Sequence, residues 1–182
     1  ADDALVFGWG NGYVEVPCNP LLSVNGSAGT PTGSFTIDAW ISLDGSSIDD
    51  GGIVEKRPFF GGPGYAFLLK NNRLKMLVSD GTTSQTASSS QVLPDTGATW
   101  THVAVIVDRS SVPGDITFVV DGVAETFLGS VTVNGPMASA APLWIGTSRW
   151  MDTPQGIGMP FPGALDEVEF FNRALSVSEI QA

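Results

Sequence analysis

The stretch that decides the fold is Phe35-Thr36-Ile37-Asp38-Ala39-Trp40-Ile41, a short run rich in β-branched and aromatic residues. Its apolar and polar side chains alternate with a period of two, which is typical of a half-buried antiparallel strand. Comparable runs occur on both sides of it, at 5–7, 13–16, 52–55, 65–69, 74–78, 100–107, 116–120, 143–145 and 164–171. The sequence therefore predicts an all-β protein of ten or more short strands.

Turn signals separate these runs. Asp-Gly occurs at 44–45, 50–51, 80–81 and 121–122, and Asn-Gly occurs at 11–12, 25–26 and 134–135. Both dipeptides favour tight turns between antiparallel strands. Many short strands with frequent turns indicate a sandwich or a barrel. The length of 182 residues fits one such domain, spanning 1–182.

Two hairpins and one helix can be predicted in detail. Asn71-Asn72 is expected to join 67–70 to 73–76 through a two-residue turn, because asparagine tolerates positive φ. Asp121-Gly122 is expected to join 116–120 to 123–127 in the same way. The sequence Ser176-Val-Ser-Glu179 fits a capping box that opens a short helix reaching Gln181. The Ser/Thr-rich patch 82–90 has the composition of a disordered segment.

Charge and composition exclude several classes of partner. The formal net charge is −11, which disfavours nucleic acid and anionic membrane surfaces. No apolar run approaches the roughly 20 residues of a membrane helix. Hydrophobic residues make up 42% of the chain and charged residues only 15%, so the domain is folded and its polar surface comes from Gly, Ser, Thr and Asn. This composition favours a secreted or cell-surface protein. The start, Ala1-Asp2-Asp3, lacks a signal peptide and is expected to belong to a mature chain or an excised module.

The single cysteine and single histidine limit the chemistry. Cys18 cannot form an internal disulfide and is interpreted as a small buried hydrophobe. His102 lies in a strand pattern and is interpreted as a packed or hydrogen-bonded strand residue. With one residue of each type, a Cys/His zinc site is excluded. No Gly-x-Ser-x-Gly motif supports a serine hydrolase.

Several motifs, taken in order, resemble those of laminin-G-like, concanavalin A-like jelly-roll domains. The opening strand pair, the Phe-Thr-x-x-x-Trp strand and the closing strand with its short helix all match. These motifs and the intervening ones are 5–17, 35–41, 53–56, 64–67, 100–105, 118–122, 143–146 and 161–176. The resemblance covers the chain from residue 4 to its end. It implies two antiparallel sheets packed face to face, with one short C-terminal helix.

The same resemblance implies a range of functions, because one fold serves many purposes. Members of the family include carbohydrate-binding modules, adhesion modules and glucanases. Relatives often carry a structural Ca²⁺ ion where the first strands meet the last. In this chain Asp3, Asn11 and Asp166 are the expected Ca²⁺ ligands, since calcium prefers carboxylate and carbonyl oxygens. The alternative is that Asp3 and Asp166 only cap turns.

A sugar site is expected on the long Gly/Pro-rich connections, which are 19–33, 56–64 and 147–163. Sugar recognition needs an aromatic face and planar polar groups. The expected ligand contacts are Lys56, Arg57, Phe59, Tyr65, Arg149, Trp150 and Asp152. Five of the eight basic residues lie between Lys56 and Lys75, which favours sulfated or uronic-acid sugars. Trp40, Trp100 and Trp144 are assigned to the core, and the aromatic loop residues have the alternative of anchoring their loops.

Catalysis is the weakest of the functional hypotheses. Glucanases of this fold use paired carboxylates, but the Glu-x-Asp-x-x-Glu signature is absent. Glu167 and Glu169 are interpreted as residues of a solvated face, and Glu55 has no predictable partner. The sequence therefore predicts a calcium-stabilised, lectin-like module that binds a polysaccharide or glycan without reacting with it. The alternatives are a protein-protein adhesion or structural module and, with less support, a glycoside hydrolase.

Overall fold

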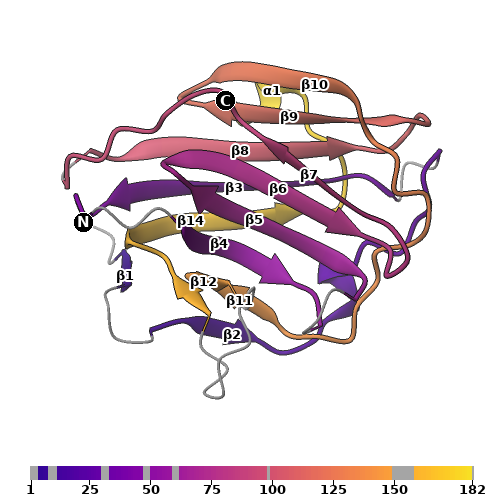
Figure 1. The fold of residues 1–182 in the computed structure, drawn as a ribbon, viewed down its shortest axis with the longest axis horizontal. Coiled ribbons are helices and arrows are strands. Elements are labelled where there is room, and N and C mark those ends of the chain that lie inside the picture. Colours follow the sequence, from indigo (N-terminus) through magenta and orange to yellow (C-terminus); the bar gives the residue numbers. More distant parts are fainter. Residues whose placement is uncertain are drawn as a thin grey trace.

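The computed structural model describes residues 4–7, 12–29, 33–46, 50–58, 62–97, 99–148 and 158–181. Within these ranges the chain forms two six-stranded sheets and one two-stranded sheet. The strands pair antiparallel throughout these sheets. The two large sheets stack face to face, with β4 to β7 in front of β3, β8 and β14 in Figure 1. The predicted all-β jelly-roll sandwich is confirmed.

Sheet A brings both ends of the chain together. In spatial order it consists of β1 (Leu5–Phe7), β14 (Gly163–Phe171), β3 (Phe35–Leu43), β8 (Thr101–Asp108), β9 (Gly114–Val120) and β10 (Val123–Val131). The first strand pairs with the last, and β14 in turn pairs with β3. This return of the chain beside its own start is the jelly-roll feature that the closing motif predicts.

Sheet B and the short elements complete the fold. Sheet B consists of β2 (Val14–Val16), β11 (Leu143–Ile145), β4 (Asp50–Lys56), β5 (Gly64–Lys70), β6 (Arg73–Ser79) and β7 (Ser84–Ser88). The small sheet pairs β12 (Thr147–Ser148) with β13 (Met159–Pro160), and the helices are η1 (Pro20–Leu22) and α1 (Val177–Ile180). None of the helices in the described ranges is long and apolar enough to cross a membrane.

Both predicted hairpins are confirmed. Asn71 and Asn72 join β5 to β6 with φ of 50° and 54°, and Asp121 and Gly122 join β9 to β10 with φ of 46° and 78°. Positive φ at both central residues is the type I′ geometry, whose twist matches that of the flanking strands. The two turns fix the register of the hairpins that they close.

The core lies between the inner faces of the two sheets. At its centre Tyr65 contacts Phe35 and Phe170, with ring centroids 4.9 and 5.6 Å apart. Residues of β3 alternate strictly, since Phe35, Ile37, Ala39 and Ile41 all belong to this core cluster. The residues between them therefore lie on the outer face of sheet A.

One fully buried cation holds two connections at the end of the sandwich. Arg109 is 0% exposed, and its guanidinium donates to the carbonyl oxygens of Gly26, Gly33, Val133 and Gly135 at 2.7 to 3.4 Å. These carbonyls come from the connection after η1 and from the one after β10. Arg109 therefore ties the two connections together by donating to their neutral carbonyl oxygens.

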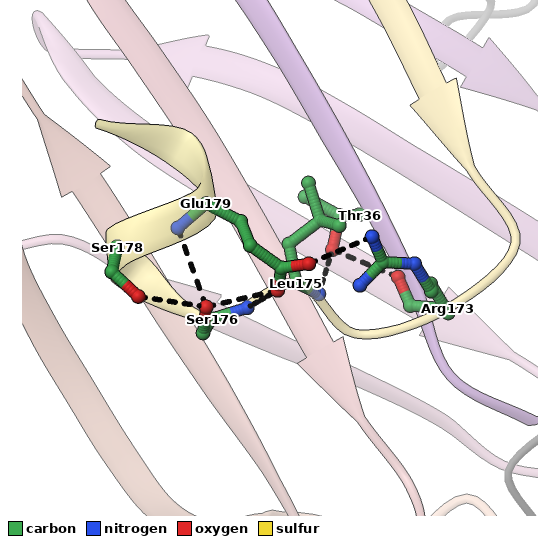
Figure 2. Close-up of polar contacts among 6 residues, drawn as sticks. All are labelled: Thr36, Arg173, Leu175, Ser176, Ser178 and Glu179. Atoms are coloured by element: carbon green, nitrogen blue, oxygen red, sulfur yellow. Dashed lines mark hydrogen bonds and ion pairs between the residues drawn. The ribbon is translucent and has the colours of Figure 1, made fainter. Parts of the chain in front are cut away.

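The predicted capping box is confirmed, and it fixes α1 on the outer face of sheet A. The Glu179 N–H donates to Ser176 Oγ at 3.3 Å, and the Ser176 N–H donates to Glu179 Oε2 at 2.8 Å (Figure 2). Below the helix, Thr36 Oγ1 donates to the Arg173 carbonyl and accepts from the Leu175 N–H, each at 3.0 Å. Val177 and Ile180 pack against a small apolar cluster on β8 and β9.

Two sequence expectations about local structure are wrong. The Ser/Thr-rich patch is not irregular, because residues 84–88 form β7 and pair with β6 over five positions. An edge strand needs few apolar side chains, so its composition resembles that of a loop. Cys18 is exposed rather than buried, because it follows β2 in the connection to η1 and not in the strand itself.

Candidate functional site

Two of the expected ligand contacts lie inside the protein. Tyr65 is 0% exposed, and its hydroxyl donates to the Leu22 carbonyl at 2.9 Å. Burial raises the pKa of the Tyr65 hydroxyl. Lys56 is also buried, and its Nζ donates to the carbonyls of Ser139 and Ala141 at 3.0 and 2.6 Å. Both side chains point to the inner face of sheet B, from which neither can reach a ligand at the surface.

Arg57 lies on the other face of sheet B in a buried polar network. Its Nε donates to Glu55 Oε1 at 2.7 Å, and Ser148 Oγ donates to Glu55 Oε2 at 2.7 Å. These contacts join β4 to β12, so Arg57 does lie beside one base of the 147–163 connection. The remaining residues of the expected sugar site, Phe59, Arg149, Trp150 and Asp152, lie outside the described residues.

The expected calcium ligands are only partly described. Asp166 lies on β14, where its Oδ1 accepts from the Glu167 N–H at 2.9 Å. Asp3 and Asn11 lie outside the described residues. In the described part of the chain no three His, Cys, Asp or Glu side chains gather in a way that could hold a metal ion. The calcium hypothesis therefore depends on Asp3 and Asn11 joining Asp166.

Of the three tryptophans assigned to the core from the sequence, only Trp144 is buried. Trp144 is buried, and its Nε1 donates to Glu15 Oε2 at 3.1 Å. Trp40 and Trp100 are 38% and 41% exposed, so their assignment to the core is wrong. Trp40 alternates with the core residues of β3 and therefore projects from the outer face of sheet A. Trp100 directly precedes Thr101, which pairs with Ile41 beside Trp40.

Trp40 lines a pocket on the outer face of sheet A. The pocket has a volume of about 550 Å³, within the range of small-molecule sites. It is lined by Trp40, His102, Asp121, Gly122, Ile180 and Gln181. Strands β3 and β8 form its floor, while the β9–β10 turn and the end of α1 form its walls. Segments far apart in the sequence thus meet around one exposed indole.

Hydrogen bonds hold the walls of this pocket in place. Gln181 Nε2 donates to the Gly122 carbonyl at 2.7 Å, which links the end of α1 to the β9–β10 turn. Asp121 Oδ1 accepts from the His102 N–H at 2.9 Å, which links that turn to β8. The cap and the Thr36 contacts of Figure 2 anchor the other end of the α1 segment. The pocket is therefore preformed by the fold.

The floor of the pocket pairs an aromatic ring with a histidine. Trp40 and His102 are cross-strand neighbours, with ring centroids 5.2 Å apart and planes inclined by 46°. His102 Nε2 lies 3.9 Å from Asp38 Oδ2, the next outward residue on β3. The interpretation of His102 as a packed strand residue is confirmed, since its side chain is only 18% exposed.

Negative charge surrounds this floor. Asp38 is 8% exposed, and among the described residues none hydrogen-bonds its Oδ1. The pKa of Asp38 is raised to about 6, first by burial and then by the negative charges of Glu169 and Glu167. Glu169 pairs directly with Asp38 across β14 and β3, and Glu167 lies at a bulge with φ of 46°. Both glutamates are exposed, as the sequence analysis expected.

The position of Trp40 in its strand pattern is a sequence signal for this pocket. Position 40 has the same parity as Thr36 and Asp38, the polar positions of its strand. A large aromatic residue at a polar-face position is a candidate surface residue. No local sequence pattern predicts that Gln181 and Asp121 line the pocket, because only the tertiary fold brings the chain end beside the β9–β10 turn.

A family comparison matches almost the whole chain. The model described as "Concanavalin A-like lectin/glucanases superfamily" matches residues 9–181. No curated protein sequence matches the chain significantly.

Solved structures share the fold at low sequence identity. The binding domain of Paraclostridial Mosquitocidal Protein 1 superposes with a TM-score of 0.64 at 15% identity, covering 93% of this chain and 39% of that one. Domains LG4-5 of the mouse laminin alpha1 chain give 0.62 at 12% identity, covering 96% and 44%. The chain thus spans less than half the length of these two structures.

A third solved structure has the size of this chain. The CBM40 of the Ruminococcus gnavus IT-sialidase, bound to alpha2,3 sialyllactose, gives a TM-score of 0.57 at 16% identity. The match covers 93% of this chain and 94% of that one. The two chains therefore share the fold over nearly their full lengths.

Proposed function

Because the chain belongs to the concanavalin A-like lectin/glucanase superfamily, we propose that it is a non-catalytic carbohydrate-binding module of a secreted or cell-surface protein. We place its glycan site at the pocket around Trp40 on the outer face of sheet A. The observation that carries the proposal is the half-exposed indole of Trp40 within a preformed pocket. An exposed aromatic ring can stack against the apolar face of a pyranose.

The polar groups of the pocket complement the ring. Asp121 Oδ2 has no hydrogen-bond partner in the described part of the chain, since only Oδ1 accepts from His102. Gln181 adds a side-chain amide at the wall of the pocket, and the His102 ring adds a hydrogen-bonding group at its floor. Planar carboxylate and amide groups suit adjacent sugar hydroxyls, which they can bind in pairs. No covalent step is required of any of these residues.

The connections 56–64 and 147–163 remain a second proposed place for glycan contact. Arg57 supports it, because it lies beside Ser148 at the base of the second connection through their shared bonds to Glu55. Phe59, Arg149, Trp150 and Asp152 would supply the other contacts. The described ends of these connections belong to β4, β5, β12, β13 and the start of β14, whereas the Trp40 pocket is lined by residues of β3, β8, the β9–β10 turn and the chain end. Single substitutions therefore distinguish the two places.

A glycan-array screen followed by titration of the best ligand tests the proposal. Trp40→Ala is expected to weaken binding at least tenfold, which is about 1.4 kcal/mol, because it removes the stacking surface. Trp40→Phe is expected to retain most of the affinity because it keeps a ring. Tyr13→Ala is the matched control, since Tyr13 is an exposed aromatic residue ahead of β2 in the other sheet.

The outcomes separate the two places. Loss of binding in Trp150→Ala with normal binding in Trp40→Ala would move the site to the connections on sheet B. Absence of binding across a broad glycan panel would contradict carbohydrate binding and favour a protein partner.

A further inference from the structure

The charged groups around the Trp40 pocket indicate which class of glycan it binds. Asp121 is the charged residue that lines the pocket, and no lysine or arginine is among the described lining residues. Asp166 pairs with Trp40 across β14 and β3, so a second carboxylate stands next to the indole. Both of these acidic groups lie on the outer face of sheet A with the ring between their strands.

Three further carboxylates extend this negative region. Asp38 lies beside His102, and Glu169 lies directly opposite Asp38 on β14. Glu167 occupies the bulge between Asp166 and Glu169. The carboxylates of this region repel one another, because the charges of Glu169 and Glu167 disfavour ionisation of Asp38. An anionic ligand would meet the same repulsion.

The basic groups on this face do not offset that charge. Arg173 holds its guanidinium against Glu179, with Nη2 donating to Oε1 at 2.9 Å. His102 has its Nε2 directed to Asp38. The basic residues between Lys56 and Lys75 belong to sheet B and its connections, on the opposite side of the sandwich. Among the described residues, no lysine or arginine lines the Trp40 pocket, so a ligand there meets the negative charge of Asp121 and of the neighbouring carboxylates.

We propose that the Trp40 pocket selects glycans that carry protonated amines, such as polymers of de-N-acetylated hexosamine, over neutral and acidic glycans. The inference rests on the proposed glycan site at this pocket. A protonated amine is attracted to the face of an indole and to nearby carboxylates at the same time. This selectivity is the reverse of the acidic-sugar preference that the basic residues 56–75 suggested from sequence.

Three oligosaccharides of equal length test the selectivity. They are an oligomer of glucosamine, the same oligomer fully N-acetylated and an oligogalacturonate, titrated by calorimetry at a pH where the amines are protonated. We expect the glucosamine oligomer to bind at least tenfold more tightly than the N-acetylated one, and the oligogalacturonate not to bind. Affinity for the glucosamine oligomer should fall as salt concentration rises, because the attraction is screened.

Asp121→Asn removes one charge with little structural change. Asparagine is favoured in a type I′ turn, and its Oδ1 can still accept from the His102 N–H. The variant is expected to bind the glucosamine oligomer three- to tenfold more weakly. Asp115→Asn is the matched control, because it removes the same charge at the far end of β9 and can keep its bond from the Gly129 N–H.

Each outcome has a distinct meaning. Equal affinity for the glucosamine and N-acetylated oligomers, or an equal loss in Asp121→Asn and Asp115→Asn, would overturn the selectivity. Binding of the glucosamine oligomer that survives Trp40→Ala would show unspecific attraction to an acidic protein and would also overturn it. Trp40-dependent binding of a neutral or acidic glycan alone would overturn the selectivity but leave the proposed function intact. If no glycan bound through Trp40, the selectivity and the placement of the glycan site at the Trp40 pocket would both fail.

Discussion

The fold places the Asp38 carboxyl group where its ionised form is disfavoured. It is nearly buried, lacks a described partner for Oδ1 and faces Glu169 across the sheet. Its pKa in the folded state is raised from 3.8 to about 6. Between these values the folded protein binds more protons than the unfolded chain, so the free energy of unfolding falls as pH rises. Above pH 6 the folded state bears the full free-energy cost of the ionised Asp38 carboxylate.

Asp38→Asn is therefore expected to stabilise the protein at neutral and alkaline pH. The interval between the two pKa values corresponds to at most about 3 kcal/mol, and we expect a gain of roughly 1–3 kcal/mol above pH 6. The gain should shrink as pH falls from 6 towards 4 and disappear below about pH 3, where the wild-type carboxyl is protonated in both states. Urea unfolding of both proteins across this pH range measures the difference, and a gain that does not depend on pH would contradict the account.

Arg109 shows the opposite situation, a buried charge with many partners. Replacing it with methionine leaves the carbonyls of Gly26, Gly33, Val133 and Gly135 without their donor. Each unsatisfied buried group costs about 1–3 kcal/mol, so we expect Arg109→Met to lose about 3 kcal/mol or more. Arg173→Met, at an exposed ion pair screened by solvent, should lose far less stability than Arg109→Met. Similar losses in the two variants, measured by urea unfolding, would show that Arg109 is not a structural cation.

Residue environments were the part of the site that sequence could predict least. Tyr65 and Lys56 lie next to a Gly/Pro-rich connection, which suggested exposure, yet both face the inside of sheet B. A lysine can be buried when carbonyl oxygens satisfy it, and no sequence pattern shows that Ser139 and Ala141 supply them. Trp40 was misassigned for a related reason, because an aromatic residue in an apolar run resembles a core residue.

At the scale of elements, α1 is short but has a clear role as a wall of the pocket. A four-residue helix has little stability of its own. Its position depends on the capping box, on the Thr36 contacts and on the bond from Gln181 to the Gly122 carbonyl. Weakening the cap should therefore affect the pocket as well as the helix.

Ser176→Ala is expected to lower the free energy of unfolding by about 1 kcal/mol. The substitution removes the hydroxyl that accepts from the Glu179 N–H (Figure 2). Ser178→Ala is the control, because the Ser178 hydroxyl contacts only the Ser176 hydroxyl and caps no backbone group. Thermal unfolding of the two variants compares them. An equal effect in both would mean that the cap does not hold α1 in place.

Most elements could be predicted because local chemistry determines them. The positive φ of Asn71, Asn72 and Asp121 follows from their residue types, and the alternation of residues 35–41 follows from one buried face. Strand β7 could not be predicted, because it pairs by backbone hydrogen bonds while its side chains stay largely polar. The two-residue strands β12 and β13 are too short to leave a period in the sequence.

At the scale of the whole molecule, the fold was predictable and the site was not. Alternating strands and ordered family motifs are distributed along the chain, so many weak signals agree on one sandwich. The Trp40 pocket combines β3, β8, the β9–β10 turn and the chain end, and none of these segments signals the others. Such a site becomes visible only when the topology is known.

Calcium dependence is a property of the whole molecule that stays a proposal. If Asp3, Asn11 and Asp166 hold Ca²⁺ together, the ion joins the start of the chain to its last strand. Removal of metal with EDTA should then lower the melting temperature, since an ion at 100 times its dissociation constant stabilises by about 2.7 kcal/mol. Asp166→Asn should reduce this effect while keeping the bond from the Glu167 N–H. An unchanged melting temperature after complete metal removal would contradict the proposal.

The most direct test of the glycan site is an NMR titration with the best ligand from the glycan-array screen. It follows the indole N–H signals of the five tryptophans. Single Trp→Phe variants assign the signals. We expect the Trp40 signal to shift most, with Trp100 next and the buried Trp144 unchanged. A titration that shifts the Trp150 signal and leaves Trp40 unchanged would contradict the central claim that sheet A carries the site.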